Sequence, residues 1–176
     1  TARVRQMAPK INKMVQLARE KGVHIVHAPS STMDFYKNHS ARKKALIQKH
    51  VEPPISLEYW FYPDKTREPP LPIDDSDEGC DSAGHPSESK ITRQIETIEI
   101  FNEDLISDSG QEMYNYFENV GVKNIILCGV HTNMCVLGRT FGIRGQIKLG
   151  RNVVLVRDLT DAMYNPEMPP YVSHEA

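Results

Sequence analysis

Cys135 is the residue of this sequence that is best placed to do chemistry. Residues 124–130 are almost wholly apolar and end in Gly129-Val130, and a helical pattern from about 133 to 149 follows them. This order predicts a buried strand, a tight connection, and Cys135 in the first turn of a helix. The free N–H groups and partial positive charge of a helix N-terminus favour thiolate over thiol and can hold an oxyanion. The pattern fits a nucleophile and also a small buried core cysteine.

The other two cysteines are poorer candidates. Cys128 lies inside the apolar run, where we expect it to be inert packing. Cys80 lies in an acidic stretch, and neighbouring carboxylates raise the pKa of a thiol, which makes it a poor nucleophile. The spacing of the three cysteines matches neither a disulfide framework, nor a zinc site, nor a Cys-x-x-Cys redox pair.

Periodic segments alternate between helical and extended patterns along most of the chain. The patterns predict helices at about 9–21, 40–49, 109–120 and 133–149, and strands at 23–27, 95–100, 124–130 and 152–158. Pro9 marks the expected start of the first helix, and Gly22 and Gly121 the ends of the first and third. Either Asp108 or Ser109 is expected to open the third. The alternation predicts an α/β fold: a doubly wound, mostly parallel sheet with helices on both faces.

Residues 50–93 interrupt this alternation with a proline-rich insertion. The insertion contains Trp60, the only tryptophan of the chain, among three further aromatic residues. Linkers seldom concentrate aromatic residues, so we expect an ordered cover over a pocket, or an interface, in preference to a linker. Its acidic stretch at 74–79 has no glutamate at the twelfth position from Asp74 or Asp75. This excludes an EF-hand loop and favours a solvated turn.

Length and charge narrow the class of protein. A chain of 176 residues predicts a single domain over 1–176. Its 21 basic and 23 acidic residues give a net charge of −2, which predicts no nucleic-acid partner and no attraction to an anionic membrane. The sequence has no apolar run long enough for a membrane span and no signal-peptide core near Thr1. The compartment stays open, because any leader peptide would precede Thr1, and the cytoplasm is the default expectation.

Residues 125–136, which read Ile-Ile-Leu-Cys-Gly-Val-His-Thr-Asn-Met-Cys-Val, together with the strand at 153–158, resemble the isochorismatase-like cysteine hydrolases. That superfamily contains nicotinamidases, carbamoylases and isochorismatases. The resemblance implies that Cys135 is the nucleophile, that the Val130–His131 peptide bond is cis, and that the N–H groups of His131 and Cys135 form an oxyanion hole. It implies hydrolysis of a small amide or related C–N bond through a thioester. It also implies a small-molecule substrate, no cofactor and a homo-oligomer. The His131 side chain is expected to face solvent or pack in its loop, with a role as a base as the alternative.

Two members of the superfamily's Asp-Lys-Cys triad are not assignable. The Asp belongs to a central first strand, which would precede the first helix. We therefore expect a chain that lacks this strand and its C-terminal end, with two half-sheets that have unpaired edges. The position of the Lys falls near Asn102 or Glu103, and neither can replace it. Lys90 and Arg93 lie before the strand and are weak substitutes.

Asp34 and His39 lie where some relatives hold a metal, but a pair of surface loop residues is the favoured interpretation. We therefore expect no metal site, and nicotinamide is disfavoured as substrate. Two functions remain open. The missing Lys favours a catalytically inactive small-molecule-binding or scaffold protein, whereas the strand–Gly–loop–Cys135 sequence favours a divergent hydrolase.

Overall fold

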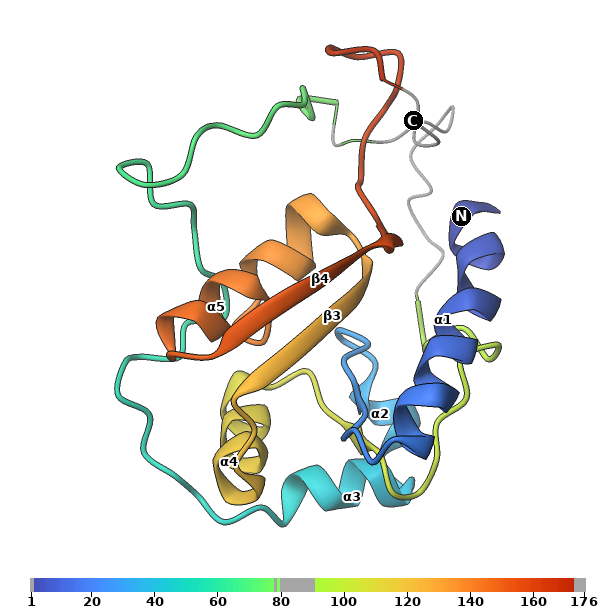
Figure 1. The fold of residues 1–176 in the computed structure, drawn as a ribbon, viewed down its shortest axis with the longest axis vertical. Coiled ribbons are helices and arrows are strands. Elements are labelled where there is room, and N and C mark those ends of the chain that lie inside the picture. Colours follow the sequence, from blue (N-terminus) through green and yellow to red (C-terminus); the bar gives the residue numbers. More distant parts are fainter. Residues whose placement is uncertain (1, 78, 80–90, 173–176) are drawn as a thin grey trace.

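The computed structural model describes residues 2–77, 79 and 91–172 (Figure 1). Helices and parallel strands are mixed along the chain, as in an α/β protein. The elements are α1 (Ala2–Glu20), β1 (Val26–His27), α2 (Met33–Tyr36), α3 (Ser40–Leu46), β2 (Leu105–Ile106), α4 (Gly110–Val120), β3 (Asn124–Val130), the short π-helical segment η1 (Thr132–Val136), α5 (Ile143–Lys148) and β4 (Asn152–Asp161). No helix among the described residues is long and apolar enough to cross a membrane.

The described strands form two separate parallel pairs. β1 pairs with β2, with Val26 opposite Leu105, and β3 pairs with β4, with Asn124 opposite Asn152. The described residues thus contain two half-sheets, and one continuous doubly wound sheet stays a prediction. We expected β3 to be buried on both faces, but one face of the β3–β4 pair is open to solvent. Ile126 and its cross-strand neighbour Val154 are each 60% exposed.

Several predicted elements differ from the structure. The strand expected at 23–27 is only Val26–His27, and the helix expected at 40–49 ends at Leu46. Residues 95–100 are not a strand: Ile98 N–H donates to the Ile95 carbonyl in a turn, and the strand lies later, at β2. The helix expected over 133–149 is two pieces, η1 and α5. The first helix begins at Ala2 and continues through Pro9. Proline removes one N–H and so one hydrogen bond to the preceding turn, and the other bonds of this 19-residue helix remain.

Helix α4 follows its sequence signals closely. The Ser109 side chain accepts a hydrogen bond from Glu112 N–H at the N-cap, so the choice between Asp108 and Ser109 is settled for Ser109. At the other end Gly121 has a φ of 74°, the left-handed conformation that ends a helix at low cost for glycine. The buried face of α4 includes Met113 and Phe117, which pack with Leu105 of β2. This core fixes the β1–β2 pair against α4.

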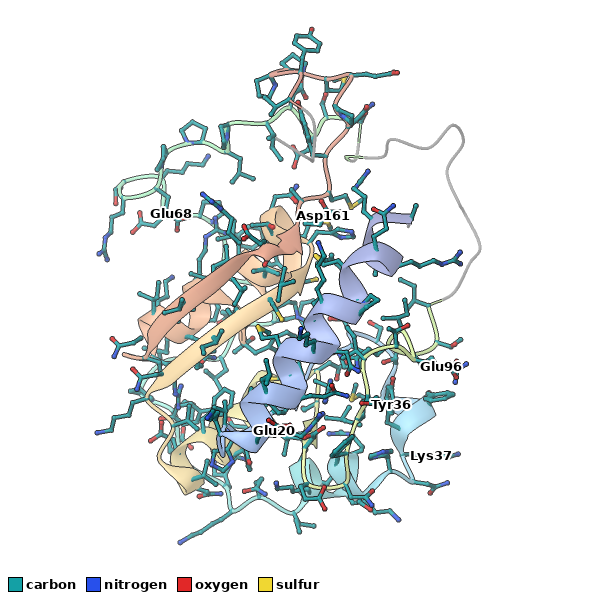
Figure 2. The ribbon with its side chains drawn as sticks, turned by 45° about the vertical axis from the view of Figure 1, so that its right-hand side comes forward. Glu20, Tyr36, Lys37, Glu68, Glu96 and Asp161 are labelled. Atoms are coloured by element: carbon teal, nitrogen blue, oxygen red, sulfur yellow. The ribbon has the colours of Figure 1, made fainter. Side chains whose placement is uncertain are left out.

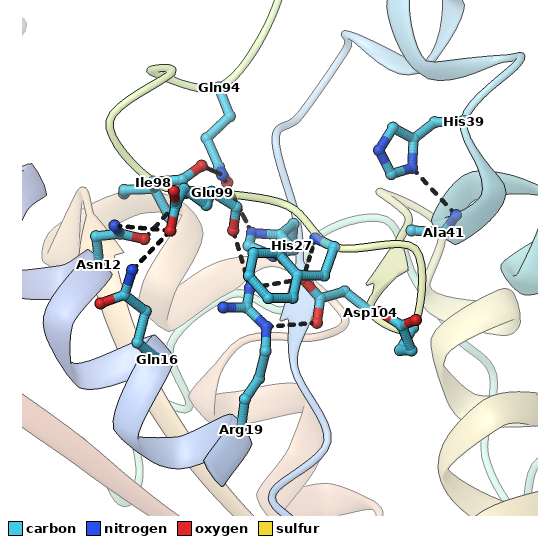
Figure 3. A network of polar contacts seen from close by, with 12 residues as sticks. Asn12, Gln16, Arg19, His27, His39, Ala41, Gln94, Ile98, Glu99 and Asp104 are labelled. Atoms are coloured by element: carbon cyan, nitrogen blue, oxygen red, sulfur yellow. Dashed lines mark hydrogen bonds and ion pairs between the residues drawn. The ribbon is translucent and has the colours of Figure 1, made fainter.

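A buried polar network joins α1 to the β1–β2 pair (Figure 3). Asp104, just before β2, is 3% exposed and accepts hydrogen bonds from three residues. They are Arg19 of α1 (Nη2–Oδ2 2.7 Å and Nε–Oδ1 2.9 Å), His27 of β1 (Nε2–Oδ2 3.1 Å) and the Phe101 N–H (2.7 Å). Burial raises the pKa of Asp104, but these hydrogen bonds and the positive charges beside it outweigh that effect. The resulting pKa is far below the ordinary value, so the group is a carboxylate at neutral pH.

Candidate active site

Cys135 lies in η1, immediately after the carboxyl end of β3. Its thiol is free and its side chain is partly exposed. η1 is not the first turn of a long helix, because Met134 has φ −120° and ψ −107°, which are not helical. Cys135 is therefore not placed in the first turn of a regular helix, where a partial positive charge would favour the thiolate. No hydrogen bond to the Cys135 sulfur is found among the residues that the structure describes.

The peptide bond between Val130 and His131 is cis, and it is the bond for which the resemblance implies that geometry. In the described part of the chain, the His131 N–H donates no hydrogen bond, so it is available to a ligand near Cys135. Burial lowers the pKa of the His131 ring, and the nearby Asp161 carboxylate offsets this only in part. The ring is therefore neutral at neutral pH. It forms no hydrogen bond with Cys135.

The carboxyl end of β4 lies beside the same turn. Asp161, labelled in Figure 2, is opposite Val130 in the β3–β4 register. It receives a hydrogen bond from Arg3 Nε of α1 at 3.0 Å. Past β4, the Asn133 side chain pairs with the backbone of Met163: its amide donates to the carbonyl (2.9 Å) and its oxygen accepts from the N–H (2.8 Å). The loop that carries Cys135 is thus tied to the segment after β4.

The proline-rich segment (the insertion at residues 50–93) contacts residues 135–140, which we call the Cys135 stretch. Trp60 forms an antiparallel β-bridge with Arg139, and Phe61 N–H donates to the Gly138 carbonyl at 2.6 Å. The Gly138 carbonyl, which a continuous helix would bond to its next turn, accepts from Phe61 N–H instead, and η1 and α5 are separate helices. The contact needs glycine at 138, since a Cβ there would stand 2.4 Å from a ring carbon of Trp60.

The structure shows no lysine at the position that the superfamily's triad requires. Asn102 and Glu103 lie in the turn before β2, and the carboxyl end of that strand leads instead to Ser107 and Asp108. Ser107 is fully buried and donates to Glu112 at 2.5 Å. Neither the turn at 102–103 nor the residues directly after β2 contain a lysine, so the position of the triad's Lys stays unassigned.

The remaining candidates have other surroundings. Arg93 pairs with Glu96 at 2.5 Å, on the surface. His39 is the N-cap of α3, where its side chain accepts from Ala41 N–H. The described residues contain no group of three metal-ligating side chains. Burial raises the pKa of the Cys128 thiol. Lys90 and Cys80 lie outside the described residues.

Sequence reasoning missed Arg139, which is 3% exposed one turn beyond Cys135. Its N–H donates to the Cys135 carbonyl at 3.1 Å, and its guanidinium lies over the Tyr59 ring at 4.0 Å. An arginine four residues after a candidate nucleophile, inside a predicted helix, was the available signal.

Comparison with known proteins gives one family. The family model described as the isochorismatase domain matches residues 1–168. Neither the comparison with curated proteins nor the comparison with solved structures gave a match. The match spans the whole α/β body, including β3, the cis Val130–His131 bond and Cys135. The chain belongs to the isochorismatase family.

Proposed function

We propose that this chain is a cysteine hydrolase that acts on a small amide or a related C–N bond. The proposal rests on two features that follow the end of β3. The thiol of Cys135 is free and partly exposed, and the His131 N–H donates no hydrogen bond within the described residues. In the proposed reaction the Cys135 sulfur attacks the amide carbonyl. The N–H groups of His131 and Cys135 stabilise the oxyanion, and the amine leaves with a proton. Water then hydrolyses the thioester and regenerates the thiol.

The same proposal includes a wider architecture. The two strand pairs are halves of one doubly wound sheet in a single domain over 1–176, with residues 50–93 as an insertion. The substrate is a small molecule bound beside Cys135, and the protein works as a homo-oligomer. The contact of Trp60 with Gly138 supports a role of the insertion as one wall of the site.

A second function is favoured by a specific observation. The residues after β2 are Ser107 and Asp108, and no side chain of a described lysine or arginine forms an ion pair or hydrogen bond with the Cys135 sulfur. A cation that stabilises the thiolate is thus lacking among the described residues. This supports a non-catalytic protein that keeps the fold to bind a small molecule or to act as a scaffold.

Alkylation of the three thiols separates the two functions without a substrate. Iodoacetamide is applied between pH 6 and pH 9, and peptide mass spectrometry gives the rate at each cysteine. The rates are normalised to those in concentrated urea, where all three thiols are exposed. For the hydrolase we expect Cys135 at pH 6 to react at least about tenfold faster than Cys128 and Cys80, because only the thiolate is nucleophilic. Reaction of Cys135 only above about pH 8.5, the value of an ordinary thiol, would favour the binding protein.

A further inference from the structure

A cavity of about 530 Å³ lies beside Arg139 and Thr140, and Cys135 is not among the residues that line it. Its walls come from the carboxyl ends of β1 and β2, from the start of α4, from the proline-rich segment and from Arg139. The volume is in the range of small-molecule sites in proteins. No residue of this cavity has a part in the proposed hydrolysis.

Arg139 gives this cavity a buried positive charge. Its Nη1 donates to the Ser30 hydroxyl and the Tyr59 hydroxyl, both at 2.9 Å, and its Nη2 donates to the Asp108 carbonyl at 2.8 Å. Its Nε has no hydrogen-bond partner. All three acceptors are neutral, and within the described residues Arg139 forms no ion pair. The rings of Tyr59 and Phe141, with centroids 4.0 and 4.8 Å from the guanidinium carbon, hold the cation in place.

The start of α4 adds free hydrogen-bond donors to the same cavity. The Ser109 side chain caps Glu112 N–H, but the N–H groups of Gly110 and Gln111 donate no hydrogen bond within the described chain. Both residues line the cavity. α4 has 11 residues, so its N-terminus carries the partial positive charge of a full helix. Free N–H groups and an unpaired buried guanidinium together call for an anionic ligand.

We propose that this cavity binds a small molecule through a carboxylate group. The carboxylate oxygens accept from the N–H groups of Gly110 and Gln111, and Arg139 supplies the counter-charge. Asp108 also lines the cavity, and its carboxylate is held by Ser31 N–H at 2.8 Å. This second negative charge disfavours a phosphate dianion and leaves room for a single negative charge. Leu57 and the Tyr59 ring offer apolar surface for the body of the ligand.

Isothermal titration calorimetry of the full chain with benzoate and with benzamide tests the charge requirement. The two probes have nearly the same shape, and only benzoate is charged. We expect benzoate to bind at least about tenfold more tightly, because hydrogen bonds to a charged group are stronger than those to a neutral one. Equal affinity of the two probes, or no saturable binding of benzoate, would overturn the proposal.

Two variants locate the binding. Arg139→Gln should reduce benzoate affinity to the level of benzamide. Because Arg139 is buried, this variant can also unfold, so Leu57→Trp serves as a second test: it fills the cavity and leaves the charge in place. The matched control is Leu71→Trp, at the edge of a different cavity near Pro169, which should bind benzoate like the wild type. Benzoate binding that survives Leu57→Trp in a protein with wild-type circular dichroism would show that the site lies elsewhere and would refute the assignment.

Discussion

Replacement of Asp104 by asparagine is expected to lower the free energy of unfolding by about 3–5 kcal/mol, because it removes one partner of a buried ion pair. Arg19 and His27 both donate to this carboxylate, and their side chains are only 14% and 4% exposed. Asparagine keeps the shape but presents no negative charge. The Arg19 guanidinium would then be left beside β2 with neutral acceptors only.

Urea unfolding at pH 7, followed by far-UV circular dichroism, measures this loss. The matched control is Asp34→Asn on α2, an exposed aspartate that forms no hydrogen bond or ion pair with the other described residues. We expect the control to change the unfolding free energy by no more than about 0.5 kcal/mol. A similar small effect of Asp104→Asn would show that the network does not hold α1 against β1 and β2.

The same network makes the wild-type protein sensitive to acid. The pKa of Asp104 is lower in the folded than in the unfolded chain, so its contribution to stability is complete at neutral pH. The contribution falls as the pH drops below about 4, where the unfolded chain begins to bind the proton. Asp104→Asn should therefore lose less stability than the wild type between pH 5 and pH 3, which is the range for comparing their urea midpoints.

Gly138→Ala is expected to destabilise the protein by about 1–3 kcal/mol, the usual cost of a forced extra methyl group in a packed site. The new Cβ would stand 2.4 and 2.5 Å from two carbons of the Trp60 ring, which is closer than atoms in contact approach. Either the ring or the backbone of the Cys135 stretch must move. The contact between the proline-rich segment and the stretch 135–140 would loosen as a result.

Trp60 itself reports this change, since it is the only tryptophan of the chain. Its emission should shift to the red in Gly138→Ala. The control is the same substitution in a Trp60→Ala background, where the methyl group meets open space and the cost should fall to near zero. An equal cost in both backgrounds would mean that the destabilisation does not come from the ring contact.

Local sequence signals predicted most of the elements that depend on neighbouring residues. The cap at Ser109, the stop at Gly121 and the bounds of β3 are all confirmed. Each of these rests on a residue type with one strong conformational preference, within a segment whose apolar pattern is unambiguous. The family was predicted from the residues around Cys135, and the family model confirms it.

Long-range contacts decided the elements that the sequence did not predict. The predicted helix over 133–149 is broken where the Gly138 carbonyl accepts from Phe61 N–H and Arg139 forms a β-bridge with Trp60, far away in the sequence. The predicted strand at 95–100 is replaced by a turn between Ile95 and Ile98, and Glu99 N–H donates to the Asn12 side chain of α1. Arg139 was missed for the same reason, because its acceptors come from the loop after β1, the loop before α4 and the proline-rich segment.

In the proposed reaction the Cys135 sulfur forms an acyl intermediate, and p-nitrophenyl acetate detects such an intermediate. We expect a burst of one p-nitrophenolate per active chain, with an acetyl group on the peptide that contains Cys135. Cys135→Ala should abolish the burst and Cys128→Ala should retain it. A burst that survives in Cys135→Ala, or an acetyl group that appears on Cys128 or Cys80 instead, would contradict the claim.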